Sequence, residues 1–166
     1  MGPMKFAKEP IRDCWDEVIA LAKLHWHETE AYRHGQPFNP NKELYFHYND
    51  IGYHHQYTVR DNGRLVGHLG MYVSQSMHTQ LTVAFEDTWF MLPEYRKGWN
   101  AIKFYKFMES DLRSMDVVEI NVSSKLANET GKLIEALGYT HTEKLYSKQL
   151  AENIHVPVST QAAACA

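Results

Sequence analysis

The spacing of hydrophobic residues along the chain predicts three long helices. From residue 11 to residue 30, apolar and aromatic positions recur every three or four residues, which is the period of one helix face. A second helix is expected to begin at Asn41, a residue type favoured at helix N-caps, and to end at Gly52. The third runs from residue 99 to residue 114, and its apolar face consists of Ala101, Phe104, Tyr105, Met108 and Leu112.

Other segments alternate between apolar and polar residues and predict strands. Residues 56–60 and 64–74 flank Asp61-Asn62-Gly63, a sequence typical of a tight hairpin turn. A third antiparallel strand over residues 79–92 extends this hairpin into a meander. Shorter strands are expected at residues 4–7, 118–122 and 145–150. A last helix over residues 126–137 should end at Gly138, where a left-handed backbone is favoured.

These elements predict an α/β (α+β) fold with a mixed central sheet, an antiparallel meander and flanking helices. The chain has 166 residues, of which 44% are hydrophobic, so one domain with its own core is expected over residues 4–150. Residues 1–3 resemble a cloning or protease scar, and residues 151–166 have no periodicity and read as a flexible tail.

Charge and hydropathy exclude several classes of function. The formal net charge of −3 argues against general binding of nucleic acid, which needs a basic face. No stretch reaches the roughly 18 apolar residues of a membrane span, and the chain starts without the pattern of a secretory signal. We therefore expect a cytoplasmic protein with no membrane partner.

The segment from residue 89 to residue 101 carries the clearest candidate chemistry. An apolar strand meets the turn Pro93-Glu94-Tyr95-Arg96 and then opens a helix. The first N–H groups of a helix have no partner within it, so phosphate oxygens bind well there, and Arg96 and Lys97 would add positive charge. An ordinary strand, turn and core helix is the alternative interpretation of the same residues.

Taken together, the order of elements and three motifs resemble the GNAT superfamily, the Gcn5-related N-acetyltransferases. The hairpin of residues 61–67 resembles the family's second and third strands, and residues 93–96 resemble the lead into its pyrophosphate loop. Residues 128–139 are similar to the family's last helix and its Leu-Gly-aromatic ending. The sequence of residues 86–96 also resembles that of phage-encoded members of the family. The resemblance covers nearly the whole of residues 4–150.

The resemblance implies acetyl-CoA as co-substrate and direct attack by a primary amine of a small molecule or a protein. It places the pantetheine arm along the backbone of Phe90, Met91 and Leu92, and Asn128 beside the thiol. It also implies a pyrophosphate cradle made of Arg96, Lys97, Gly98, Trp99, Asn100 and Ala101. Trp99 stands where the family usually has glycine, so the loop either uses Gly98 instead or binds the cofactor more weakly.

For catalysis the resemblance implies a carboxylate base on the strand before the loop. Strict alternation would put Glu86, Thr88 and Phe90 on one face and Asp87 on the other, so only one acid would enter the cleft. We favour Glu86, although either acid could instead be a solvated strand residue. Ile134 occupies the position of the family's usual tyrosine acid, which leaves Tyr139 and Tyr146 as candidate substitutes.

The acceptor amine is expected near the end of the first helix. Trp26, Glu28 and Glu30 combine an aromatic ring with carboxylates, which suits a cationic amine. We expect no metal, because His25 and His27 are two residues apart and diverge on a helix. A homodimer is left open. The alternative function is a GNAT-shaped protein, weak or inactive in catalysis, that binds a protein partner.

Overall fold

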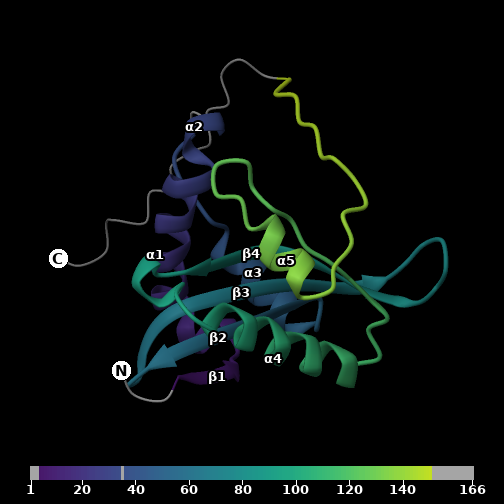
Figure 1. The fold of residues 1–166 in the computed structure, drawn as a ribbon, viewed down its shortest axis with the longest axis horizontal. Coiled ribbons are helices and arrows are strands. Elements are labelled where there is room, and N and C mark those ends of the chain that lie inside the picture. Colours follow the sequence, from purple (N-terminus) through teal and green to yellow (C-terminus); the bar gives the residue numbers. More distant parts are fainter. Residues whose placement is uncertain (1–3, 35, 151–166) are drawn as a thin grey trace.

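A five-stranded sheet forms the centre of the computed structural model, which describes residues 4–34 and 36–150 (Figure 1). The strand order is β1-β2-β3-β4-β5. Neighbouring strands are antiparallel except for β4 and β5, which are parallel because a helix connects them. The strands are β1 (Lys5–Lys8), β2 (His54–Asp61), β3 (Arg64–Gln75), β4 (Thr82–Met91) and β5 (Glu119–Asn121). The predicted mixed sheet with an antiparallel meander is confirmed.

Helices cover both faces of the sheet. On one face lie α1 (Ile11–Thr29) and α3 (Lys42–Asp50), where Trp15 packs against Tyr45 with ring centroids 5.7 Å apart. On the other face lies α4 (Asn100–Ser114), whose Tyr105 packs edge-on against Trp89 of β4. The remaining helices are short: α2 (Ala31–His34), the 3-10 turn η1 (Pro93–Tyr95) and α5 (Gly131–Ala136).

Several local signals act as the sequence indicates. The hairpin turn between β2 and β3 places Asn62 at φ 47° and Gly63 at φ 85°, the left-handed conformation that such turns need. The side chain of Asn41 accepts a hydrogen bond from the backbone N–H of Leu44 at 3.0 Å, so it is the N-cap of α3. Gly138 follows α5 at φ 96°, as expected for the residue that ends a helix.

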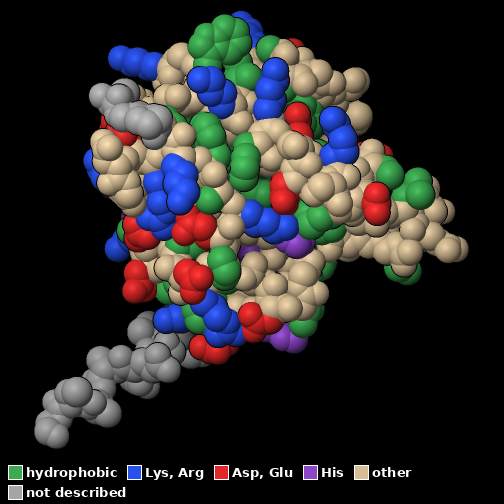
Figure 2. Space-filling model, turned by 90° about the horizontal axis from the view of Figure 1, so that it is seen from below, with side chains coloured by type: hydrophobic (Ala, Val, Ile, Leu, Met, Phe, Trp, Pro, Cys, Tyr) green, Lys and Arg blue, Asp and Glu red, His purple; other side chains and the backbone are tan. Residues whose placement is uncertain are grey.

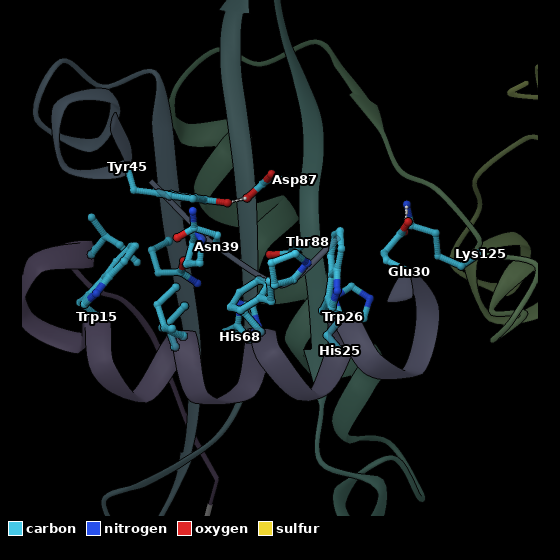
Figure 3. A pocket seen from close by; sticks show the side chains of 18 residues that line it. Trp15, His25, Trp26, Glu30, Asn39, Tyr45, His68, Asp87, Thr88 and Lys125 are labelled. Atoms are coloured by element: carbon cyan, nitrogen blue, oxygen red, sulfur yellow. Dashed lines mark hydrogen bonds and ion pairs between the residues drawn. The ribbon is translucent and has the colours of Figure 1, made fainter. Parts of the chain in front are cut away.

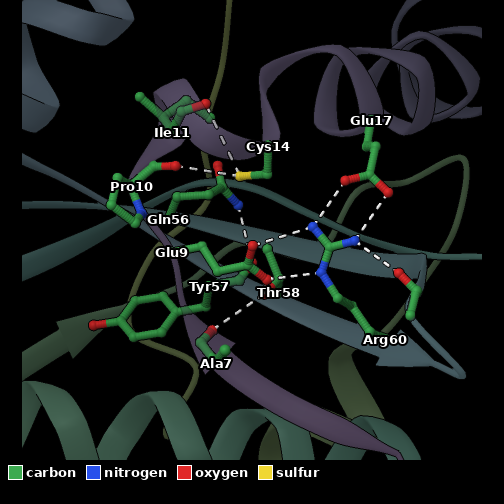
Figure 4. Close-up of polar contacts among 11 residues, drawn as sticks. Ala7, Glu9, Pro10, Ile11, Cys14, Glu17, Gln56, Tyr57, Thr58 and Arg60 are labelled. Carbon is green, nitrogen blue, oxygen red and sulfur yellow. Dashed lines mark hydrogen bonds and ion pairs between the residues drawn. The ribbon is translucent and has the colours of Figure 1, made fainter.

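A polar cluster anchors the start of α1 to the sheet (Figure 4). Arg60 of β2 pairs with Glu9 before the helix at 2.9 Å and with Glu17 inside it at 2.8 Å. These hydrogen bonds lower the pKa of both carboxyls. Because the guanidinium donates to two carboxylates at once, it sets the position of α1 over the strands.

Three predicted elements differ from the structure. The strand expected from residue 79 begins at Thr82, because a turn closed by the Ser76 N–H and the Leu81 carbonyl precedes it. The helix expected over residues 126–137 is confined to Gly131–Ala136, since Ser124 and Asn128 make polar contacts that compete with a first helical turn. The strand expected at residues 145–150 is wrong: these residues are exposed and irregular, and they pair with none of the five strands of the described sheet.

The expected segments at residues 1–3 and 151–166 lie outside the described residues. Among the helices of residues 4–34 and 36–150, none is long and apolar enough to cross a membrane. Basic and acidic side chains are interspersed over the face shown in Figure 2.

Candidate active site

A β-bulge in β4 shapes the site. Gly70 of β3 pairs with Thr88 and Met71 pairs with Glu86, so Asp87 has no partner of its own and the ladder shifts by one residue. As a result Asp87 and Thr88 both face α1, while Glu86 turns toward Tyr105 of α4. The expected strict alternation is therefore wrong. Bulges reorient side chains in this way, and they are frequent beside active sites.

Asp87 reaches a cavity of about 450 Å³ between α1 and the sheet (Figure 3). Its walls are mainly apolar and aromatic side chains of α1 and of residues 37–40, including Trp15, Trp26 and Phe38. Its polar lining residues are His25, Glu30, Asn39, Tyr45, Gln56, His68, Asp87, Thr88 and Lys125. A mostly apolar hollow with a few convergent polar groups is typical of a small-molecule site.

The carboxylate of Asp87 is held by tyrosine. The hydroxyl of Tyr45 donates to its Oδ2 at 2.8 Å, and burial raises the pKa of Asp87 while that hydrogen bond opposes the rise. The Nε2 of His54 lies 3.8 Å from the same oxygen, too far for a hydrogen bond. Gly70 makes this approach possible, because a Cβ there would lie 2.8 Å from His54 Nε2 and 3.3 Å from Asp87 Oδ2.

Two buried histidines of the sheet, His54 on β2 and His68 on β3, have no hydrogen-bond partners among the described residues. The ring nitrogens of His54 and His68 are all unpaired, and His68, which lines the cavity, is only 1% exposed. Burial lowers the pKa of His68 to about 3 and that of His54 to about 4, so both rings are neutral near pH 7. Buried polar groups are usually paired, and orphaned ones point to an unmet contact.

A second, smaller cavity of about 30 Å³ lies between the end of α1, β4 and the segment after β5, and Glu86 lines it. Glu86 accepts hydrogen bonds from Tyr105 at 3.0 Å and from Ser123 at 3.3 Å. Burial nevertheless raises its pKa to about 7. The two cavities share His25 and Lys125 as lining residues, so they are neighbours, and each is lined by one of two adjacent carboxylates of β4.

The expected anion loop leaves room for a ligand. Gly98 has φ 71°, and no atom lies within 4 Å of the position where its Cβ would be. Trp99 is the N-cap of α4 with no side-chain cap, and it is 70% exposed. The N–H of Lys103 is the first to bond within the helix, to the Trp99 carbonyl, so the N–H groups of Asn100, Ala101 and the following residue precede that ladder. The open backbone at Gly98 favours the register that uses this glycine.

The outer edge of β4 is open along the segment where the resemblance puts the pantetheine arm. β5 pairs only with Val83, Ala84 and Phe85, which leaves residues 86–91 without a β5 partner in the described chain. Phe90, Met91 and Leu92 are buried within the core.

The guanidinium of Arg96 binds other residues of the protein rather than extending into the expected anion loop. Its Nε donates to the Met91 carbonyl at 2.8 Å, and its two terminal nitrogens pair with Glu28 at 2.8 and 2.7 Å. Asn128 donates to the same carboxylate, and Lys125 pairs with Glu30 at 2.8 Å. The contacts of Lys125 and Asn128, which both line the small cavity, tie the end of α1 to the segment after β5.

The predicted residues therefore divide into groups. Trp26 and Glu30 line the large cavity, and Glu86, Asp87 and Asn128 lie at the two cavities, whereas Glu28 is engaged with Arg96. Lys97 is exposed beside Gly98. Tyr139 packs against Tyr105 and lines neither cavity, and Tyr146 is 85% exposed.

Sequence reasoning missed Tyr45, His54 and His68 as site residues. Tyr45 fits the apolar face of its helix and the two histidines fall within ordinary strand patterns, so no spacing signal marks them. The pairing of β2, β3 and β4 brings His54 to Asp87, and the packing of α3 brings Tyr45 there. No group of three His, Cys, Asp or Glu side chains in residues 4–34 and 36–150 is arranged to hold a metal ion.

Comparisons with known proteins identify the fold. No family model matches the chain, and no curated protein does. A ribosomal-protein-alanine N-acetyltransferase from Brucella melitensis biovar Abortus 2308 is similar, with a TM-score of 0.70 and 18% identity over 90% of this chain and 99% of that one. An aminoglycoside acetyltransferase from an uncultured soil metagenomic sample gives 0.73 and 11% identity over 90% and 97%.

A predicted acetyltransferase from Clostridium acetobutylicum, solved with acetyl-CoA, gives a TM-score of 0.66 at 13% identity over 92% of this chain and 100% of that one. At these identities the likeness is one of fold. The chain has the fold of GNAT acetyltransferases over nearly the whole described range.

Proposed function

We propose that this protein is an N-acetyltransferase that moves an acetyl group from acetyl-CoA to a primary amine. The observation that carries the proposal is a pair of neighbouring cavities that share His25 and Lys125, with Glu86 lining one and Asp87 lining the other. A transferase that joins two substrates directly needs two such compartments with a common boundary, so that the reacting atoms are held together.

The residues around the α4 N-terminus fit the cofactor. Gly98 leaves its backbone open, the first N–H groups of α4 can bind phosphate oxygens, and Lys97 adds positive charge nearby. The unpaired edge of β4 offers backbone groups to the pantetheine arm. A backbone N–H donated to the thioester oxygen would supply a factor of roughly 10²–10³ in rate.

The acceptor binds as an ammonium ion, and after losing a proton its nitrogen forms a bond to the thioester carbon while the carbon–sulfur bond breaks. The CoA thiolate leaves and takes up the second proton that the nitrogen loses, whereas the first must be removed by a base before the attack. Glu86 accepts that proton, because its raised pKa of about 7 matches a base working near neutral pH. Tyr105 and Ser123 hold its carboxylate in place. Asp87 binds the ammonium form of the amine across the bulge.

The small cavity must widen before the cofactor's thioester can enter, because its 30 Å³ is about the volume of one water molecule. Glu28 binds both Arg96 and Asn128, and Asn128 lines this cavity. We propose that these contacts part when acetyl-CoA binds, which frees Arg96 to meet the phosphates.

Isothermal titration calorimetry with acetyl-CoA tests the cofactor site. We expect saturable binding that Lys97→Glu weakens about tenfold, while Lys106→Glu, an exposed residue further along α4, leaves it unchanged. Release of free thiol in the presence of amines then tests transfer. Absence of acetyl-CoA binding at millimolar concentration would refute the proposal and favour the alternative of a partner-binding protein.

A further inference from the structure

The size, lining and charges of the large cavity indicate which class of amine is the acceptor. We propose that the acceptor is a compact aromatic monoamine, an inference that rests on the acetyltransferase function proposed above. Asp87 binds its single ammonium group, and His68 hydrogen-bonds a polar group at the other end of the molecule. Three observations support this class: the size and lining of the cavity, its balance of charges, and the unpaired ring of His68.

The cavity suits a small body with an aromatic ring. Its volume of about 450 Å³ corresponds to roughly 15 non-hydrogen atoms, if each takes the 30 Å³ of a water molecule. Trp15, Trp26 and Phe38 line it, together with aliphatic residues of α1 (Figure 3). Aromatic rings are favoured against such walls, whereas a sugar or an extended peptide would leave its hydroxyl or amide groups unpaired.

The charges of the cavity favour one positive charge on the ligand. Its two lining carboxylates are Asp87 and Glu30, and Glu30 already pairs with Lys125 at 2.8 Å and with His34 at 3.2 Å. No lysine or arginine of the described chain forms an ion pair with Asp87. A polycation would bring further charges that find no free carboxylate and that Lys125 would repel.

His68 supplies the second polar point. Both of its ring nitrogens lack partners among the described residues, although it is fully buried and lines the cavity. On β3 it precedes Gly70 and Met71, the residues that flank the bulge at Asp87, by two to three positions, or roughly 7–10 Å along the strand. In an aromatic amine with a hydroxyl group on the far side of its ring, the two polar groups lie at opposite ends of the molecule, so Asp87 can bind the amine while the hydroxyl satisfies the imidazole.

Four amines test this inference by thiol release with saturating acetyl-CoA: tyramine, phenylethylamine, spermidine and kanamycin. We expect kcat/KM for tyramine to exceed that for phenylethylamine by about tenfold, and that for the two polycations by at least a hundredfold. Higher kcat/KM for spermidine or kanamycin would overturn the monoamine class while leaving the acetyltransferase proposal intact.

Two variants test the assigned contacts. Asp87→Asn should raise KM for tyramine about 10- to 100-fold, as expected when a charge-assisted hydrogen bond is lost, and Asp16→Asn on the exposed side of α1 serves as the control. His68→Leu should abolish the preference for tyramine over phenylethylamine and also stabilise the fold, because it removes an unpaired buried ring. A preference that survives His68→Leu would refute the role of His68.

Calorimetry with the amines alone separates the two proposals. Tyramine binding that is weakened by Asp87→Asn supports the inference even if no acetyl transfer occurs. If acetyl-CoA binds but tyramine neither binds nor reacts, the acceptor class is wrong and the cofactor site stands.

Discussion

Replacing Glu86 with glutamine should make the protein more stable and less active, an opposition that tests the role of this residue. Burial raises the pKa of the Glu86 carboxyl from 4.5 to about 7, which means that the folded state disfavours its charged form. Between these two values the folded protein holds a proton that the unfolded chain has lost. Stability therefore falls as pH rises from 4.5 to 7 and stays lower above that.

The shift sets the size of the effect. A difference of 2.5 pH units corresponds to about 3 kcal/mol at 1.36 kcal/mol per unit. Glutamine has a similar shape and no charge, so Glu86→Gln should recover up to about 3 kcal/mol of unfolding free energy at pH 8 and almost none at pH 4. For a chain of this size that corresponds to roughly 6–12 °C in melting temperature.

Urea denaturation at pH 5 and pH 8 gives the unfolding free energies of the parent protein and of Glu86→Gln. The control is Glu135→Gln, since Glu135 is an exposed residue on α5. Because other groups titrate too, the quantity compared is the difference between each variant and the parent protein. In parallel, kcat/KM of the parent should rise with pH through about 7 and should fall 10²- to 10⁴-fold in Glu86→Gln. A variant that is less stable than the parent at pH 8, or equally active, would refute the reasoning.

Three further predictions follow from the site. Gly70→Ala should destabilise the protein by about 1–3 kcal/mol in urea, because its Cβ would meet His54 Nε2 at 2.8 Å, whereas Gly131→Ala, whose Cβ meets only one atom at 3.8 Å, should be close to neutral. His54→Leu should reduce the loss of unfolding free energy as pH falls below 6.5. Burial lowers the pKa of His54 to about 4, so between these two values only the unfolded chain binds the proton. An unchanged slope of unfolding free energy against pH would contradict this. Glu28→Gln should tighten acetyl-CoA binding about two- to fivefold by calorimetry, because it releases Arg96 from a partly exposed ion pair worth about 1 kcal/mol or less; weaker binding would show that the pair helps to build the site.

The elements that can be predicted from the sequence are those whose signals are local. The period of apolar residues predicts α1 and α4, Asp61-Asn62-Gly63 predicts the hairpin, and Asn41 predicts the start of α3, because each depends on neighbours within a few positions. The same local logic failed at residues 145–150. Their pattern allows a strand, but a strand also needs a partner, and these residues pair with none of the five strands of the described sheet.

The assembly of the site, in contrast, depends on contacts between residues that are distant in the sequence. A single unpaired residue in β4 moves Asp87 to the α1 face and leaves Glu86 on the other, and this bulge depends on the pairing with β3 rather than on the residues of β4 alone. Arg96 looks like a phosphate ligand in the sequence, yet it pairs with Glu28, which is 68 positions away along the chain. His68 becomes a candidate site residue only because it is buried beside the cavity under α1. Contacts between residues that are distant in the sequence produce no periodic pattern from which this could be predicted.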